Sequence, residues 1–146
     1  MEIENHWIQD WLSCRAEAYK TELDENSEIV TTEIHRDEGE IAGENIVKAN
    51  VPAKVSIITG NALKVIPTLK GPFDFAFIDA EKSEHFQYLK LAENKLRKGA
   101  VVFGDNAGIF ADQMRDYLDY VRNSGNYKSR YMQVGDDGVE ISVKQS

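Results

Sequence analysis

Two apolar stretches decide how this chain is read: FDFAFIDAEK at residues 73–82 and GAVVFGDN at residues 99–106. Neither run has a helical period, both are rich in aromatic or β-branched residues, and they stop at Asp79 and at Asp105. Such runs are typical of buried parallel strands. One helix-length segment separates them, so we expect a right-handed β-α-β unit with both strand ends at one edge of a sheet.

The residues at that edge are candidate metal ligands. Ligands bind at the carboxyl ends of the strands in open α/β sheets, and Asp79, Asp105 and Asn106 offer the hard oxygen donors that Mg²⁺ prefers. The alternative is that Asp79 caps the next helix while Asp105 and Asn106 form a turn. Because two neighbouring strands end in this way, the pair favours a cation site.

The rest of the chain alternates between strand and helix patterns. The expected strands cover 28–34 and 54–59, and the expected helices cover 37–49, 63–69 (interrupted by Pro67), 83–96 and 111–121. Gly99 stands where the cap of the crossover helix would need a positive φ angle. Residues 127–134 and 139–143, joined by 135–138, predict an antiparallel hairpin.

These elements predict an α/β fold: a Rossmann-like three-layer sandwich with a mostly parallel sheet and a C-terminal antiparallel hairpin. At 146 residues we expect a single domain, 1–146. Residues 1–23 form its N-terminal helical segment, in which Trp7 and Trp11 lie on one amphipathic face. That face would pack in the core or at a homodimer contact.

Composition restricts the partners. A net charge of −8 argues against nucleic acid, which is bound through clustered Lys and Arg, but not against a small polyanion. The single cysteine, Cys14, excludes an internal disulfide and suits a reducing compartment. No signal-like or membrane-spanning segment is recognisable, so a cytoplasmic location is expected.

Other polar residues near strand ends have two readings each. Glu33 would accept hydrogen bonds from a ribose diol or be a solvated acid, and Asn61 would meet an adenine edge or form an Asx-turn. Lys82 would lie in the Asp79 cleft, where a cation or burial favours the neutral amine of a general base, or be a solvated lysine. We interpret His35 and His85 as structural or exposed.

The same stretches resemble successive motifs of a known enzyme family. VTTE at 30–33, GNAL at 60–63, the DAEK of residues 79–82, the LRKG of 96–99 and the DN of 105–106 are similar to the cation-dependent, S-adenosylmethionine-dependent O-methyltransferases of the catechol and caffeoyl-CoA group. The similarity runs from Glu28 to the C-terminus and includes DGVEIS at 137–142. The DAEK and DN motifs are its specific part.

The resemblance implies a site. Asp79, Asp105 and Asn106 would hold a divalent cation, Mg²⁺ by preference, which chelates a hydroxyl pair of a small-molecule acceptor. Lys82 would act as general base. Four residues would contact the cofactor: Glu33 at the ribose, and Asn61, Ala62 and Asp79. Asn61 and His85 depart from the family, which commonly has Asp and Tyr at these places.

A glycine-rich turn of the Glu-x-Gly-x-Gly type, with its preceding strand, is expected upstream in this family, and residues 1–28 contain no match. That strand would lie mid-sheet, between the strands that end at Glu33 and near Asp79, and without it their ladder groups would be unpaired. Either the natural protein has a segment that this sequence lacks, with the junction near residues 12–18, or another element fills the place.

The sequence therefore leaves two main functions in competition. One is a cation-dependent O-methyltransferase, and the other is a non-catalytic or ligand-binding protein of the same fold that has lost the cofactor turn. An NAD-dependent oxidoreductase would also explain Glu33, but it would not require Asp79, Asp105 and Asn106 together.

Overall fold

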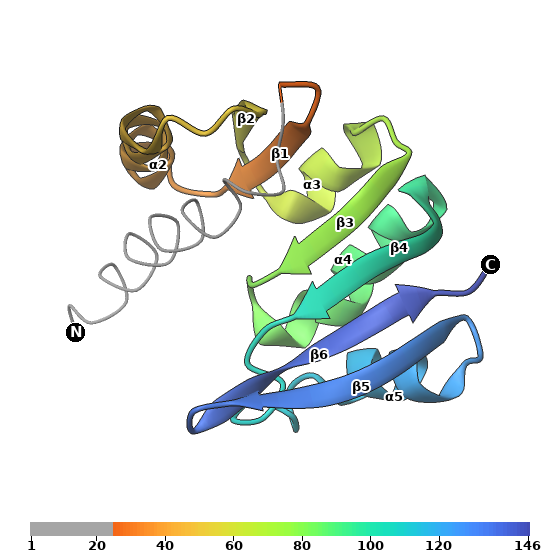
Figure 1. The fold of residues 1–146 in the computed structure, drawn as a ribbon. Helices are drawn as coiled ribbons and strands as arrows, with labels where there is room; N and C mark the ends of the chain where they lie inside the picture. Colours follow the sequence, from red (N-terminus) through yellow and green to blue (C-terminus); the bar gives the residue numbers. More distant parts are fainter. Residues whose placement is uncertain (1–24) are drawn as a thin grey trace. The chain divides into compact units, whose positions relative to one another are not determined.

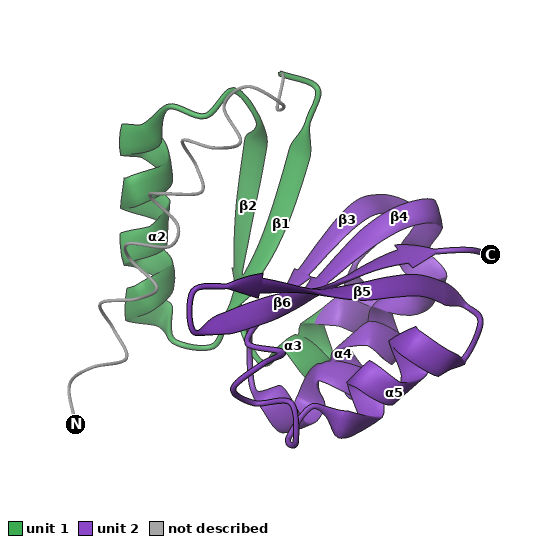
Figure 2. Ribbon diagram, turned by 60° about the horizontal axis from the view of Figure 1, so that its bottom comes forward, with its two compact units in different colours: residues 1–65 green, residues 66–146 purple. Residues whose placement is uncertain are grey.

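The computed structural model describes residues 25–146, which divide into two compact units at Val65 (Figure 2). The N-terminal helical segment predicted for residues 1–23, with Trp7 and Trp11, lies outside the described residues. Each unit is considered by itself. The α/β, Rossmann-like class predicted from the sequence is confirmed, and strand bounds agree with the pattern to within a few residues.

In the first unit, two parallel strands are paired in register. These are β1 (Glu28–Glu33) and β2 (Lys54–Thr59), with Glu28 opposite Lys54 and Glu33 opposite Thr59. Helix α2 (Arg36–Ala49) connects them, and the short helix α3 (Ala62–Val65) follows β2. Helix α2 is capped by Asn50, whose positive φ of 48° is a left-handed conformation that asparagine tolerates.

The second unit is a four-stranded sheet in the order β3-β4-β6-β5, with helices α4 and α5 on one face (Figures 1 and 2). The strands and helices are β3 (Phe73–Ile78), α4 (His85–Ala92), β4 (Leu96–Gly104), α5 (Arg115–Asn123), β5 (Tyr127–Val134) and β6 (Asp137–Lys144). Single 3₁₀ turns cover Ile66–Thr68, Lys82–Glu84 and Glu93–Lys95. The parallel pair β3-β4 is the predicted β-α-β unit, and the antiparallel pair β5-β6 is the predicted hairpin.

The core of the second unit lies between the sheet and its two helices. Fully or almost fully buried side chains come from β4, α4, α5 and the residue before α5: Leu89, Leu96, Ala100, Val102, Met114, Tyr117, Leu118 and Val121. The spacing of Met114, Leu118 and Val121 is the helical period read from the sequence. These buried side chains pack α5 against the sheet and so restrict the loop that precedes the helix.

Several local expectations differ from the structure. The crossover helix expected over 83–96 is shorter, because Leu96 already belongs to β4, and the helix expected over 111–121 begins only at Arg115. Gly99 has the positive φ that the sequence predicted, at 82°, but it lies inside β4 instead of capping a helix. The pairing of β3 with β4 shifts between Phe73 and Phe75, so the glycine sits in an irregular part of the strand. The hairpin turn is also shorter than expected, because Val134 pairs with Asp137 and leaves only Gly135 and Asp136 unpaired.

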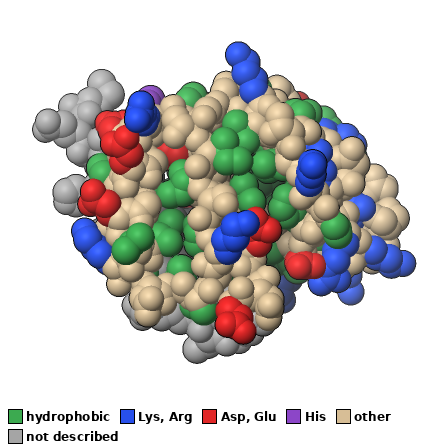
Figure 3. All heavy atoms as spheres, turned by 90° about the horizontal axis from the view of Figure 1, so that it is seen from above, with side chains coloured by type: hydrophobic (Ala, Val, Ile, Leu, Met, Phe, Trp, Pro, Cys, Tyr) green, Lys and Arg blue, Asp and Glu red, His purple; other side chains and the backbone are tan. Residues whose placement is uncertain are grey.

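The strand expected between those ending at Glu33 and Ile78 is not among the described elements. The described strands form two separate sheets, with β1 in the two-stranded one and β3 outermost in the four-stranded one. Large apolar side chains are exposed in both units, among them Val47 and Phe75, and Figure 3 shows hydrophobic side chains between charged ones on one face. No described helix is long and apolar enough to cross a membrane.

Candidate active site

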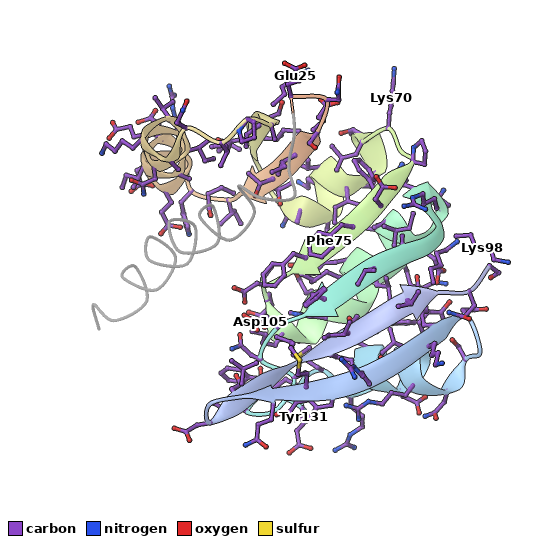
Figure 4. All side chains as sticks on the ribbon, viewed as in Figure 1. Glu25, Lys70, Phe75, Lys98, Asp105 and Tyr131 are labelled. Carbon is purple, nitrogen blue, oxygen red and sulfur yellow. The ribbon has the colours of Figure 1, made fainter. Side chains whose placement is uncertain are left out.

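The carboxyl ends of β3 and β4 lie side by side. Ile78 is paired with Gly104, and the backbone N–H of Asp105 donates to the carbonyl oxygen of Ile78 at 3.0 Å. Asp79 and Asp105 are therefore the next residues after a paired position on neighbouring strands. Figure 4 shows Asp105 where β4 ends. This is the shared edge predicted from the two apolar stretches.

Lys82 is held at this edge by Asp79. Its Nζ lies 2.7 Å from Asp79 Oδ1, and the side chains are 14% and 33% exposed. The lysine is thus mostly shielded from water, which disagrees with the alternative that Lys82 is a solvated surface residue. Between the two residues, the Glu81 side chain accepts from the Ser83 backbone N–H and begins the Lys82–Glu84 turn. Glu81, not Asp79, supplies that cap.

Asn106 follows with a strained backbone and a specific amide contact. Its φ of 59° is in the left-handed region, which asparagine adopts more readily than most residues. Its Nδ2 donates to Asp137 Oδ2 at 2.8 Å. Burial alone would raise the pKa of Asp137, but hydrogen bonds from Ile109 and Asn106, among others, outweigh it and leave that pKa below its ordinary value.

The described residues contain no group of three His, Cys, Asp or Glu side chains arranged to hold a metal. The candidate set contains only two residues of these types, because its third ligand is the amide of Asn106. Its chemistry nevertheless fits a hard cation: two half-exposed carboxylates follow paired strand positions, and the amide oxygen of Asn106 is left over once its nitrogen binds Asp137.

His85 is buried completely behind this edge. Its Nδ1 lies 3.1 Å from the Glu81 carbonyl oxygen, and its Nε2 lies 3.2 Å from that of Ile78. The ring therefore ties the end of β3 to the turn that carries Lys82. The structural reading of His85 is confirmed, and His35 is exposed. Sequence spacing could not have located these contacts, since they depend on the path of the loop.

The burial of His85 predicts a pH dependence of stability. Desolvation lowers its pKa from the ordinary 6.5, against the pull of the two carbonyl oxygens. The unfolded chain then binds the proton more readily, so the free energy of unfolding should fall as the pH drops below about 6.5. Urea unfolding of the wild type and of His85→Gln between about pH 5 and 8 measures this. An equally steep loss in the variant would assign the effect to other groups.

In the first unit, Glu33 ends β1 and Asn61 follows β2. Glu33 Oε1 accepts from the backbone N–H of His35 at 3.2 Å, and burial together with the Glu33 charge raises the pKa of nearby Glu38. Asn61 Oδ1 accepts from the N–H of Leu63 at 2.8 Å, which is the Asx-turn read as the alternative role. Ala62 is the first residue of α3. The Asx-turn uses one of the two lone pairs of the Asn61 amide oxygen, so an adenine contact would use the other lone pair or the amide nitrogen.

The fold and the strand-end residues define an α/β protein with a cluster of oxygen donors at the carboxyl edge of its sheet. Residues 13–137 match the profile of a family described as O-methyltransferase. This match covers most of the chain, and the chain therefore belongs to the O-methyltransferase family.

Curated proteins similar to this chain have names that belong to the same family. Catechol O-methyltransferase B of Danio rerio is 34% identical over 134 residues, which is 83% of this chain and 50% of that protein. Catechol O-methyltransferase of Mycobacterium tuberculosis is 39% identical over 89 residues, 58% of this chain and 40% of the relative. Caffeoyl-CoA O-methyltransferase 1 of Zea mays is 32% identical over 137 residues, 82% and 51% of the two chains. The chain thus spans about half the length of the curated relatives it matches.

Solved structures support the fold. The O-methyltransferase of Bacillus cereus in complex with SAH has a TM-score of 0.78 at 22% identity, and the alignment covers 99% of this chain and 82% of that one. The O-methyltransferase TomG of Streptomyces achromogenes in complex with SAM has a TM-score of 0.75 at 19% identity, covering 94% and 80%. At these identities the likeness establishes a shared Rossmann-like fold.

Proposed function

We propose that this protein transfers a methyl group from S-adenosylmethionine to a hydroxyl of a small molecule, with the help of a divalent cation. The observation that carries the proposal is the juxtaposition of two strand ends, one bearing Asp79 and Lys82 and the other Asp105 and Asn106, in a chain of the O-methyltransferase family. The names of the relatives, catechol and caffeoyl-CoA O-methyltransferase, favour an acceptor with neighbouring hydroxyls.

Asp79, Asp105 and the amide oxygen of Asn106 are the ligands we assign to the cation, which we take to be Mg²⁺. A cation held there would lower the pKa of a bound hydroxyl and so allow a nucleophilic oxygen at neutral pH. The protein's own contribution is position. The hydrogen bond from the backbone N–H of Asp105 to the Ile78 carbonyl joins the ends of β3 and β4, and the hydrogen bond from the Asn106 side chain to Asp137 holds the residues after β4 against β6 before any ligand arrives.

Lys82 is the base we assign. Its Nζ already lies at the candidate cation site through its contact with Asp79, and its low exposure limits competition from water. As a neutral amine it would take the proton of the acceptor hydroxyl. The acceptor oxygen would bond to the methyl carbon while the bond from that carbon to the sulfonium sulfur breaks, and S-adenosylhomocysteine would leave.

The cofactor residues we assign in the first unit are Glu33 for the ribose hydroxyls and Asn61 and Ala62 beside the adenine. A carboxylate can accept from both hydroxyls of a ribose, and Glu33 stands at a strand end, as such acids do in dinucleotide folds. In the second unit, Asp79 is assigned to the cofactor as well as to the cation.

Replacing Glu33 with glutamine should weaken cofactor binding about 10-fold, since the amide can accept only one of the two ribose hydrogen bonds and carries no charge. Calorimetric titration with S-adenosylhomocysteine measures the affinity. Glu28→Gln makes the same change at the other end of β1, where Glu28 pairs with Lys54, and should bind like the wild type. Equal affinities for all three proteins would remove Glu33 from the cofactor site.

The same titration separates methyl transfer from the non-catalytic alternative. An absence of heat and of any thermal shift with wild-type protein at millimolar S-adenosylhomocysteine would favour a protein that has lost its cofactor turn. The glycine-rich turn, missing from residues 1–28, makes this a real test. The cytoplasmic location and the homodimer stay predictions from the sequence.

A further inference from the structure

The carboxylate of Asp137 accepts several hydrogen bonds from the segment that follows β4. Asp137 is the first residue of β6, which runs antiparallel to β4 and places Glu140 opposite Gly104. Its Oδ2 accepts from Asn106 Nδ2 at 2.8 Å. Its Oδ1 accepts from the backbone N–H groups of Gly108 at 3.0 Å and of Ile109 at 2.9 Å.

These bonds determine which way the Asn106 amide faces. A primary amide has a donor end and an acceptor end, and an ionised carboxylate can only accept. Asp137 therefore selects the Nδ2 end, which leaves Oδ1 as the end turned away from it. A cation can be coordinated by the amide oxygen but not by the amide nitrogen with its two protons. The orientation set by Asp137 is thus the one that coordination requires.

The segment from Asn106 to Ile109 also has little freedom to move away from Asp137. A Cβ atom at Gly108 would lie 2.6 Å from the Tyr131 hydroxyl and 2.8 Å from Asp137 Oδ1, so a larger residue there would have to displace these side chains. Figure 4 shows Tyr131 on β5, the strand beyond β6. The N–H of Ala107 donates to the Gly138 carbonyl oxygen at 2.9 Å, which is a further tie between the loop and the hairpin.

We propose that Asp137 is a positioning residue for the cation site: it holds the Asn106 amide with its oxygen toward the cation and its nitrogen away from it. The inference rests on the cation site of the proposed function. Groups that orient metal ligands in this manner commonly change metal affinity 10- to 100-fold when they are replaced. Asp137 would touch neither the cation nor the reacting atoms.

Asp137→Asn is the most informative single substitution, because it replaces the acceptor that faces Asn106 with a donor and keeps an acceptor for Gly108 and Ile109. The new side chain can still accept from Gly108 and Ile109 through its oxygen, but its nitrogen would face Asn106 Nδ2, donor against donor. The Asn106 amide should then flip and turn its nitrogen toward the cation. We expect Mn²⁺ affinity, measured by electron paramagnetic resonance titration with MnCl₂ alone, to fall about 10-fold or more.

The matched control is Asp136→Asn. It removes the same charge one residue away, in the exposed two-residue turn of the hairpin. If the effect at Asp137 were only a loss of negative charge near the cation, both variants would lose affinity alike, and the inference would be overturned. We expect Asp136→Asn to bind Mn²⁺ as the wild type does.

A charge swap supplies the rescue. In the double variant Asp137→Asn, Asn106→Asp the new amide donates to one oxygen of the new carboxylate, whose other oxygen faces the cation. Total charge equals that of the wild type. We expect the double variant to recover most of the Mn²⁺ affinity that Asp137→Asn loses, and a double variant as weak as the single one would contradict the inference.

One measurement needs no variant and covers the case in which Asp137→Asn fails to fold. A crystal structure of the wild type with Mn²⁺ should show Asn106 Oδ1 on the metal and Nδ2 still bonded to Asp137. Loss of that bond on metal binding would overturn the inference and leave the proposed function standing. A wild-type protein that binds no Mn²⁺ would overturn the cation site of the proposed function, and the inference with it.

Discussion

Replacing Asp105 with alanine is expected to abolish cation-stimulated methyl transfer, with a loss of at least about 100-fold in kcat/KM. The variant keeps the backbone bond from residue 105 to Ile78 but loses one of the two carboxylates assigned to the cation. Mg²⁺ is bound mainly through carboxylates, and removal of one leaves too little negative charge to hold it. Activity with and without Mg²⁺, with a catechol as acceptor, measures the effect.

Asp112→Ala is the control for this experiment. Asp112 lies in the loop between Asp105 and α5, its side chain is 97% exposed, and its contact with Arg115 is a surface ion pair of the kind that contributes little. Its loss should leave both activity and melting temperature near those of the wild type. Full activity in Asp105→Ala, or an equal loss in Asp112→Ala, would show that the metal assignment is wrong.

The strand ends could be read from the sequence because the physical signal there is local. A buried strand shows as an apolar run, its end shows as a polar residue, and a helix-length spacer requires the two strands to be parallel. Those three facts place Asp79 and Asp105 at one edge without any knowledge of side-chain packing. The pairing of Ile78 with Gly104 confirms that step.

The contacts of Asp137 could not be read in this way. It was assigned to the turn of the hairpin, and only the register of β6 against β5 and β4 makes it the first strand residue, next to Asn106. A shift of one residue would turn its carboxylate to the opposite face of the sheet. Register across an antiparallel pair depends on turn geometry and packing, which single-sequence patterns represent poorly.

The buried carboxylate of the second unit and its ion pair also could not be predicted from the sequence. Glu140 looks like an alternating polar residue of a strand, yet its side chain is completely buried. Arg122 on α5 reaches it with two hydrogen bonds, from Nε to Oε1 at 3.0 Å and from Nη2 to Oε2 at 2.6 Å, and Ser129 Oγ donates to Oε1 at 2.6 Å. No periodicity couples residues 18 positions apart on a helix and a strand.

This pair leads to the largest expected effect on stability. Arg122→Met should lower the free energy of unfolding by about 3 kcal/mol, since it leaves Glu140 buried with its main partner gone. The value lies at the lower end for a buried pair because the Arg122 side chain is itself 42% exposed, so water can reach the vacated position. Urea unfolding at neutral pH measures the change, and Arg130→Met, on the exposed part of β5, is the matched control.

A double variant tests whether the loss comes from the unpaired charge or from lost packing. Arg122→Met together with Glu140→Leu removes both charges and should recover most of the stability, because apolar residues of similar volume can replace a buried pair at little net cost. If stability stays low in the double variant, the Arg122 stem and the Ser129 bond contribute more than the charge pair. A cost below about 1 kcal/mol for Arg122→Met would contradict the prediction, because it would mean that the buried carboxylate of Glu140 does not depend on this partner.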